Sequence, residues 1–162
     1  MSKNPENNFK VPKVIGKQSN FSGCILKNYE ETISIGEELL KVFPSIKLLL
    51  LEGPLGVGKT SLVKGIAKYL KIQEPITSPS FPLSQHYLFG EQPLIHLDLY
   101  RLDKGSGANE LFLQEEEEAN SLKALIVIEW PERLTIRLQE AWRIQLKYLE
   151  SGERFLNLQR PS

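Results

Sequence analysis

The amino-acid sequence predicts an α/β fold in which a mixed, mostly parallel sheet carries helices on both faces and ends in an antiparallel hairpin. Apolar runs of strand length alternate with segments of helical periodicity, a pattern typical of parallel strands joined by helices. Residues 142–159 instead alternate apolar and polar side chains around the turn "ESGE", which predicts the hairpin. A chain of 162 residues is long enough to bury its own core, so we expect one domain at 21–162.

Residues 1–20 are predicted to form a flexible N-terminal extension. They mix Asn, Lys, Pro and Gly with few large apolar side chains, so they bury too little surface to offset the entropy of ordering. No apolar stretch of signal-peptide type is present there, and "LLLL" at 48–51 is far too short to span a bilayer. The single cysteine, Cys24, permits no internal disulfide. These features predict a cytoplasmic protein with no membrane partner.

The predicted elements begin with a short strand at 21–26, followed by a helix at 28–43. Asn28 is a suitable N-cap for this helix, with Glu31 three residues on, and Pro44 ends it. The helix is expected to bury one face, made of Tyr29, Ile33, Gly36, Leu40 and Phe43.

Three longer apolar runs predict buried strands, at 46–52, 94–100 and 124–130. The first run leads through a Gly-rich turn into a helix at 60–70, in which apolar residues recur with helical spacing. Between the second and third runs, 103–122 predicts a loop followed by an acidic helix. The chain thus alternates strand and helix before its hairpin.

The Gly-rich turn matches the phosphate-binding pattern G-x-x-x-x-G-K-[ST] at Gly53, Gly58, Lys59 and Thr60. Glycines let backbone N–H groups close around phosphate oxygens, and the following helix N-terminus adds its positive dipole. Lys59 is expected to reach the β and γ phosphates, and the Thr60 hydroxyl to ligate Mg²⁺. The other loop residues predicted to contact the nucleotide are Pro54, Leu55, Gly56, Val57 and Ser61.

P-loop chemistry also requires a carboxylate at the end of a neighbouring strand, to hold the magnesium shell or to position a water. Two candidates follow apolar runs, Asp98 and Glu129, and both are expected at the carboxyl edge of the sheet. Either could instead cap its strand or pair with Arg101. The predicted catalytic residues are therefore Lys59, Asp98 and Glu129, with Thr60 and Glu129 at the metal.

The sequence also narrows the class of P-loop protein. A GTPase would need a guanine-binding Asn-Lys-x-Asp element, which this chain lacks. A small-molecule kinase remains an alternative, although such enzymes close an Arg-bearing lid over the phosphoryl group, and 102–132 contains no arginine. Basic and acidic residues both number 20, so net charge alone would not attract nucleic acid.

Five motifs, in this order and spacing, resemble the TsaE (YjeE) family. They are "ETISIGEEL", "GPLGVGKTSLVKGIAKYL", "ITSPSFPL", "HLDLYRL" and "VIEWPE", and together they cover roughly residues 25–135. Members of that family are bacterial P-loop ATPases needed to make threonylcarbamoyladenosine (t6A) in tRNA. The resemblance implies ATP and Mg²⁺ as cofactors and the proteins TsaB and TsaD as partners, with tRNA reached only indirectly.

The resemblance also extends the expected site beyond the P-loop. Thr77, Ser78 and Ser80 match the family segment that responds to phosphate or orders a water, and Ser80 keeps a hydroxyl where Thr is commoner. Trp130 follows Glu129 directly and is included among the nucleotide-binding residues, although stacking on a partner or packing in the core is equally open. His96 lies two residues before Asp98 on the same predicted strand, so the two side chains are expected on one face.

Three functions follow from these observations. The first is an ATP-binding and hydrolysing component of the t6A machinery that drives a conformational cycle. The alternatives are a small-molecule P-loop kinase and a nucleotide-dependent binding switch that does not hydrolyse.

Overall fold

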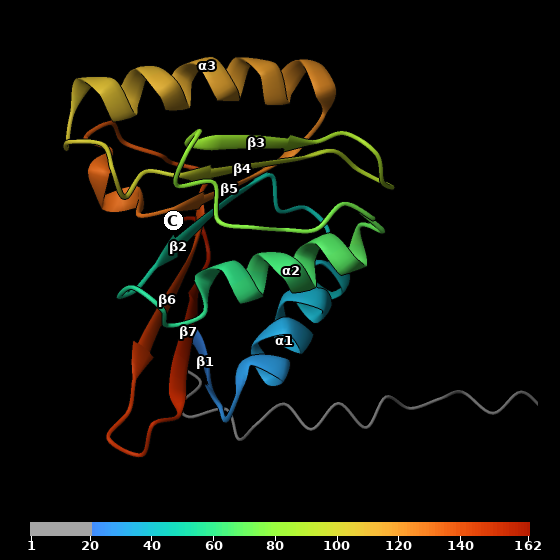
Figure 1. The fold of residues 1–162 in the computed structure, drawn as a ribbon, viewed down its shortest axis with the longest axis vertical. Coiled ribbons are helices and arrows are strands. Elements are labelled where there is room, and N and C mark those ends of the chain that lie inside the picture. Colours follow the sequence, from blue (N-terminus) through green and yellow to red (C-terminus); the bar gives the residue numbers. More distant parts are fainter. Residues whose placement is uncertain (1–20) are drawn as a thin grey trace, which may run out of the picture.

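The computed structural model describes residues 21–162, and the predicted extension at 1–20 lies outside them. Seven strands form one sheet in the order β1-β7-β6-β2-β5-β4-β3 (Figure 1). The strands are β1 (Phe21–Leu26), β2 (Leu48–Glu52), β3 (Ser84–Tyr87), β4 (Leu94–Asp98), β5 (Leu125–Glu129), β6 (Trp142–Tyr148) and β7 (Arg154–Gln159). The helices are α1 (Tyr29–Val42), α2 (Lys59–Tyr69), α3 (Ser106–Leu122) and the short 3-10 helix η1 (Pro131–Arg133).

The centre of the sheet is parallel and its two sides are antiparallel. β2 pairs with β5 and with β6 in parallel, and β4 pairs with β5 in parallel. The β6–β7 hairpin, with β1 beyond it, closes one side, and β3 closes the other. In the β4–β5 register Asp98 lies opposite Glu129, so the two predicted carboxylates end adjacent strands side by side.

Helices cover both faces of the sheet, as predicted. In Figure 1, α1 and α2 lie against one face and α3 lies against the other. Because side chains alternate along a strand, Leu49 and Leu51 of β2 enter the core under α1 and α2, whereas Leu50 enters the core under α3. Asp98 and Glu129 continue the alternation of β4 and β5 on the α2 side. That alternation directs both carboxylates toward the start of α2.

α1 and α2 cross at two glycines. A Cβ atom at Gly65 would lie 1.9 Å from the carbonyl oxygen of Ile33, and one at Gly36 would lie 2.2 Å from that of Leu62. Such distances are far below van der Waals contact, so neither position accepts a side chain unless the helices separate. The two glycines therefore allow the backbones of α1 and α2 to touch.

α1 begins as expected, because Oδ1 of Asn28 accepts a hydrogen bond from the Glu31 backbone N–H over 2.9 Å. Its buried face differs in part from the prediction. Thr32 and Leu39 are buried in addition to the expected Gly36 and Leu40, whereas Tyr29 is 45% exposed. Tyr29 leaves the core because its hydroxyl donates to the carbonyl oxygen of Gly56 in the P-loop.

Two elements were not expected, and the three predicted buried strands, β2, β4 and β5, are each two residues shorter than expected. β3 has only Tyr87 buried, so its sequence lacks a strand-like apolar pattern, and pairing with β4 makes it a strand. η1 begins one residue after β5, and the residue between them, Trp130, has a left-handed conformation with φ of 59°. β4 ends at Asp98 rather than at Tyr100, because Oδ1 of Asp98 accepts from the Tyr100 N–H and turns the chain.

Among the described residues 21–162, no helix combines the length and the apolar character that crossing a membrane requires.

Candidate nucleotide site

The P-loop leaves the carboxyl end of β2 and leads directly into α2 (Figure 1). Gly53, Gly56 and Gly58 all have positive φ angles, and Gly58, the N-cap of α2, has φ of 118°. L-residues with side chains rarely adopt this backbone region. No side chain caps the helix at Gly58. The first N–H groups of α2 are therefore free to bind an anion, and the helix dipole favours one there.

Lys59 is the buried cation of this loop, with 4% of its surface exposed. Its Nζ donates to the carbonyl oxygens of Gly53 (2.5 Å) and Pro54 (3.1 Å) and lies 4.1 Å from the ring centroid of Trp130. Burial lowers the pKa of Lys59, and the carboxylates of Glu129, Glu132 and Asp98 oppose that shift. The nearby carboxylates thus do not fully offset the cost of burying the positive charge, and this favours binding of a phosphate.

Glu129 joins the P-loop helix to the sheet. Its Oε1 accepts a hydrogen bond from the Thr60 hydroxyl (2.8 Å) and lies 2.9 Å from Nε2 of His96. Glu129 is 3% exposed and His96 is fully buried. An ionised carboxylate only accepts hydrogen bonds, so Nε2 of His96 carries the hydrogen. The opposite nitrogen, Nδ1, has no hydrogen-bond partner among residues 21–162, so Glu129 is the one side chain there that His96 bonds.

Asp98 is held by different donors. Its Oδ2 accepts from the Ser78 hydroxyl over 2.5 Å, and its Oδ1 accepts from the backbone N–H of Tyr100 over 3.0 Å. Ser78 belongs to the loop between α2 and β3, so Asp98 connects that loop to the carboxyl edge of the sheet. His96 and Asp98 lie on the same face of β4, as expected.

A cavity of about 440 Å³ opens where these residues meet. The predicted residues that line it are Leu55, Gly56, Gly58, Lys59, Thr60, Ser61, Ser80, Asp98, Glu129 and Trp130, together with Ser78. Four predicted positions do not line it. Gly53 and Pro54 turn carbonyl oxygens toward Lys59, and Val57 is fully buried in the core. Thr77 of the same loop as Ser78 is exposed and also lies outside the cavity.

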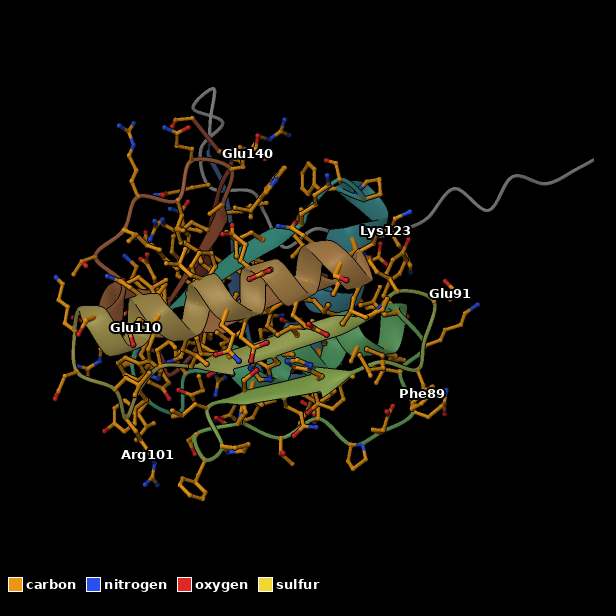
Figure 2. All side chains as sticks on the ribbon, turned by 90° about the horizontal axis from the view of Figure 1, so that it is seen from above. Phe89, Glu91, Arg101, Glu110, Lys123 and Glu140 are labelled. Atoms are coloured by element: carbon orange, nitrogen blue, oxygen red, sulfur yellow. The ribbon has the colours of Figure 1, made fainter. Side chains whose placement is uncertain are left out.

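Sequence reasoning missed part of the cavity wall. Tyr29, Tyr100 and Arg101 also line it, and the Tyr100 and Trp130 rings pack with centroids 4.8 Å apart. Figure 2 shows Arg101 extending outward from the molecule. Tyr29 was assigned to the core by its helical spacing, and no local sequence signal distinguishes a tyrosine that leaves the core for a loop.

Neither histidine belongs to a metal-binding group of the usual kind. Within the part of the chain that the structure describes, His96 bonds only Glu129, and Nε2 of His86 lies 2.6 Å from Glu115 on α3. Among residues 21–162 no cluster of three or more His, Cys, Asp or Glu side chains is arranged to hold a metal. A divalent cation here would therefore depend on Thr60, one carboxylate and phosphate oxygens, an arrangement that suits Mg²⁺.

The glycine-lined loop between a central parallel strand and a helix places this chain in the class of P-loop nucleotide-binding folds. Comparison with known families makes the assignment more specific. The profile of the family described as "Threonylcarbamoyl adenosine biosynthesis protein TsaE" matches residues 26–156. The chain therefore belongs to the TsaE family.

Individual relatives agree with this assignment. The tRNA threonylcarbamoyladenosine biosynthesis protein TsaE of Nostoc sp. is 37% identical over 129 residues, which cover 80% of each chain. The protein of the same name from Treponema pallidum is 35% identical over 132 residues, covering 81% of this chain and 95% of that one. The crystal structure of Bacillus subtilis YdiB is similar with a TM-score of 0.66 at 26% identity, covering 91% of this chain and 90% of that one.

Proposed function

We propose that this chain binds and hydrolyses ATP as a component of the machinery that makes threonylcarbamoyladenosine in tRNA, together with TsaB and TsaD. The observation that carries the proposal is the meeting of Lys59, Thr60 and Glu129 in one cavity, at the carboxyl edge of a parallel sheet. Relatives named for this biosynthesis share most of the chain.

Lys59 and the N-terminus of α2 bind the phosphates in this proposal. The Lys59 ammonium exchanges the carbonyl oxygens of Gly53 and Pro54 for β- and γ-phosphate oxygens. Because Lys59 is buried, the attraction between its ammonium and the phosphates is stronger than the same attraction in water.

Thr60 and Glu129 fit Mg²⁺, because a hydroxyl and a carboxylate oxygen 2.8 Å apart are the hard donors that this ion prefers. The ion, when bound, would neutralise charge that develops on the phosphates. His96 keeps the Glu129 carboxylate oriented through Nε2. Asp98 faces the same cavity with Ser78 and Ser80, and these side chains are suited to orient the attacking water.

The structure favours hydrolysis over phosphoryl transfer to a small molecule. The segment that would have to act as a kinase lid, 102–132, contains α3, β5 and the first two residues of η1. Phe112, Ala108 and Ala119 of α3 are buried against the sheet, so this segment is part of the core and not a mobile cover. Figure 2 looks down on α3, with Glu110 toward one end and Lys123 at the other.

The test is release of inorganic phosphate from ATP and Mg²⁺ without any added acceptor, measured for the chain alone and with TsaB and TsaD. We expect slow release alone and faster release with both partners, because a supplied arginine or a reordered loop can raise such rates by roughly 10³ to 10⁵. Turnover that needs a small-molecule acceptor would support the kinase alternative. Tight ATP binding without turnover in the presence of both partners would support the non-hydrolysing switch.

A further inference from the structure

The residues that line the cavity form two chemically different groups. Asp98 and Glu129 are carboxylates that end β4 and β5, and Glu129 bonds Thr60 at the start of α2. Tyr29 belongs to α1 and bonds Gly56 in the P-loop. Lys59 and Thr60 interact with the β and γ phosphates in P-loop sites, so the terminal phosphate points toward the carboxylates. We therefore expect the nucleoside to lie at the other group, beside Tyr29 and Gly56.

Contacts with the P-loop hold Tyr29 in place. Its hydroxyl donates to the carbonyl oxygen of Gly56 over 2.9 Å, and its ring edge, at Cε1, lies 3.8 Å from where a Cβ atom of Gly58 would stand. The ring nevertheless remains 45% exposed. A partly exposed aromatic ring held in one orientation beside a phosphate loop is suited to contact a flat ligand group.

Arg154 supports the ring from β7. Its guanidinium carbon lies 4.1 Å from the Tyr29 ring centroid and 5.8 Å from that of Tyr148. The Nε atom of Arg154 donates to the carbonyl oxygen of Val57 in the P-loop over 2.9 Å. Arg154 is only 8% exposed, so three segments far apart in the sequence meet at this point: α1, the P-loop and the C-terminal hairpin.

We propose that the Tyr29 ring, supported by Arg154, is the platform on which the nucleobase of the bound nucleotide stacks. This inference rests on the proposed nucleotide binding and adds the residue that contacts the base. Stacking on an aromatic ring tolerates different bases, because each base presents a π-face. The platform therefore contributes affinity for nucleotides over inorganic polyphosphates, without selecting adenine over guanine.

The experiment compares Tyr29→Leu with Tyr29→Phe, using ATP, GTP and inorganic tripolyphosphate, each with Mg²⁺. Binding is measured by isothermal titration calorimetry on the full chain. Leu removes the aromatic ring and the hydroxyl, whereas Phe removes only the hydroxyl that bonds Gly56. We expect Tyr29→Leu to weaken ATP and GTP about tenfold, in line with the loss of one base–aromatic stack. Tripolyphosphate should bind the Leu variant and the parent chain equally.

Tyr29→Phe keeps the ring and loses the hydrogen bond to Gly56, so any loss of affinity in it should be the same for ATP, GTP and tripolyphosphate, and smaller than the loss of ATP affinity in Tyr29→Leu. An equal loss of tripolyphosphate and ATP affinity in Tyr29→Leu would overturn the proposal, because Tyr29 would then only shape the P-loop. Unchanged ATP affinity in that variant would also overturn it. Failure of the parent chain to bind ATP would instead overturn the proposed function, and this inference with it.

Discussion

Thr60 and Glu129 are 69 residues apart in the sequence, yet the Thr60 hydroxyl donates to Oε1 of Glu129 over 2.8 Å. The same oxygen lies 2.9 Å from Nε2 of His96. One carboxylate oxygen thus connects the P-loop helix to two neighbouring strands, β5 and β4. Substitutions at the residues around this oxygen are therefore expected to have different effects on nucleotide binding, hydrolysis and Mg²⁺ dependence.

Lys59→Ala is expected to weaken ATP binding about a hundredfold or more, because it removes a buried cation whose partners would be phosphates. Lys64→Ala is the matched control, since Lys64 lies on the same helix but is exposed. Calorimetric titration of both variants with ATP and Mg²⁺ measures the difference. Equal affinities in two folded variants would rule out the P-loop assignment.

Asp98→Asn and Glu129→Gln are each expected to reduce the rate of ATP hydrolysis by roughly a hundredfold or more, with a much smaller change in ATP affinity. The reason is that positioning of water and metal matters most in the transition state. Phosphate release with TsaB and TsaD present is the measurement. Asp103→Asn, at an exposed position, is the control. Normal rates in both site variants would show that the two carboxylates are structural.

His96→Leu tests a residue that positions Glu129. We expect it to raise the Mg²⁺ concentration needed for half-maximal hydrolysis by about tenfold or more, as loss of a partner of a metal ligand does elsewhere. Stability, followed as Tm, is a separate readout, because the variant removes a donor to the buried Glu129 carboxylate and also a buried Nδ1 atom that has no partner among residues 21–162. His86→Leu is the control, since His86 pairs with Glu115 outside the cavity. An unchanged Mg²⁺ requirement in His96→Leu would assign His96 a packing role only.

The lowered pKa of Lys59 predicts a pH-dependent stability in the absence of nucleotide. Between that lowered pKa and the ordinary value of 10.5 the unfolded chain binds more protons than the folded one, so stability contributed by Lys59 rises with pH. Lys59→Met lacks this dependence. We therefore expect a higher Tm for the variant at pH 7, with the difference narrowing toward pH 10. A lower Tm for Lys59→Met at pH 7 would mean that Gly53, Pro54 and Trp130 fully compensate the charge.

The balance of 20 basic and 20 acidic residues predicts weak binding of tRNA by the chain alone. Few counterions would be released, so the dissociation constant at physiological salt should be roughly 10⁻⁴ M or weaker. Fluorescence anisotropy with labelled tRNA, at two salt concentrations, measures this. The same titration with TsaB and TsaD present shows whether tRNA is reached through partners. Tight, salt-sensitive binding by the lone chain contradicts an indirect role.

Much of the site could be predicted because its residues sit in regular positions. A P-loop follows a buried strand, and Asp98 and Glu129 end apolar runs, so parallel pairing alone brings both carboxylates to one edge. Tyr29 and Arg154 could not be predicted in this way. Their places depend on the crossing of α1 over α2 and on the pairing of the predicted hairpin with β2, and neither relation has a local sequence signal.

β3 is another element that could not be predicted from the local sequence. Of its four residues, Ser84 to Tyr87, only one is buried, so periodicity does not identify a strand there. Hydrogen bonding to β4 decides the conformation, and that partner lies beyond an intervening turn.

The contact between Gly36 and Gly65 has a consequence for nucleotide recognition, although neither glycine lines the cavity. α1 carries Tyr29 in its first turn, and the first turn of α2 carries the N–H groups proposed to bind phosphate. The close approach of the two helices therefore sets the distance between the Tyr29 ring and the P-loop. A methyl group added at Gly65 would push the helices apart and lengthen that separation. Selection for one distance between base and phosphate would therefore act on a pair of residues that never touch the ligand.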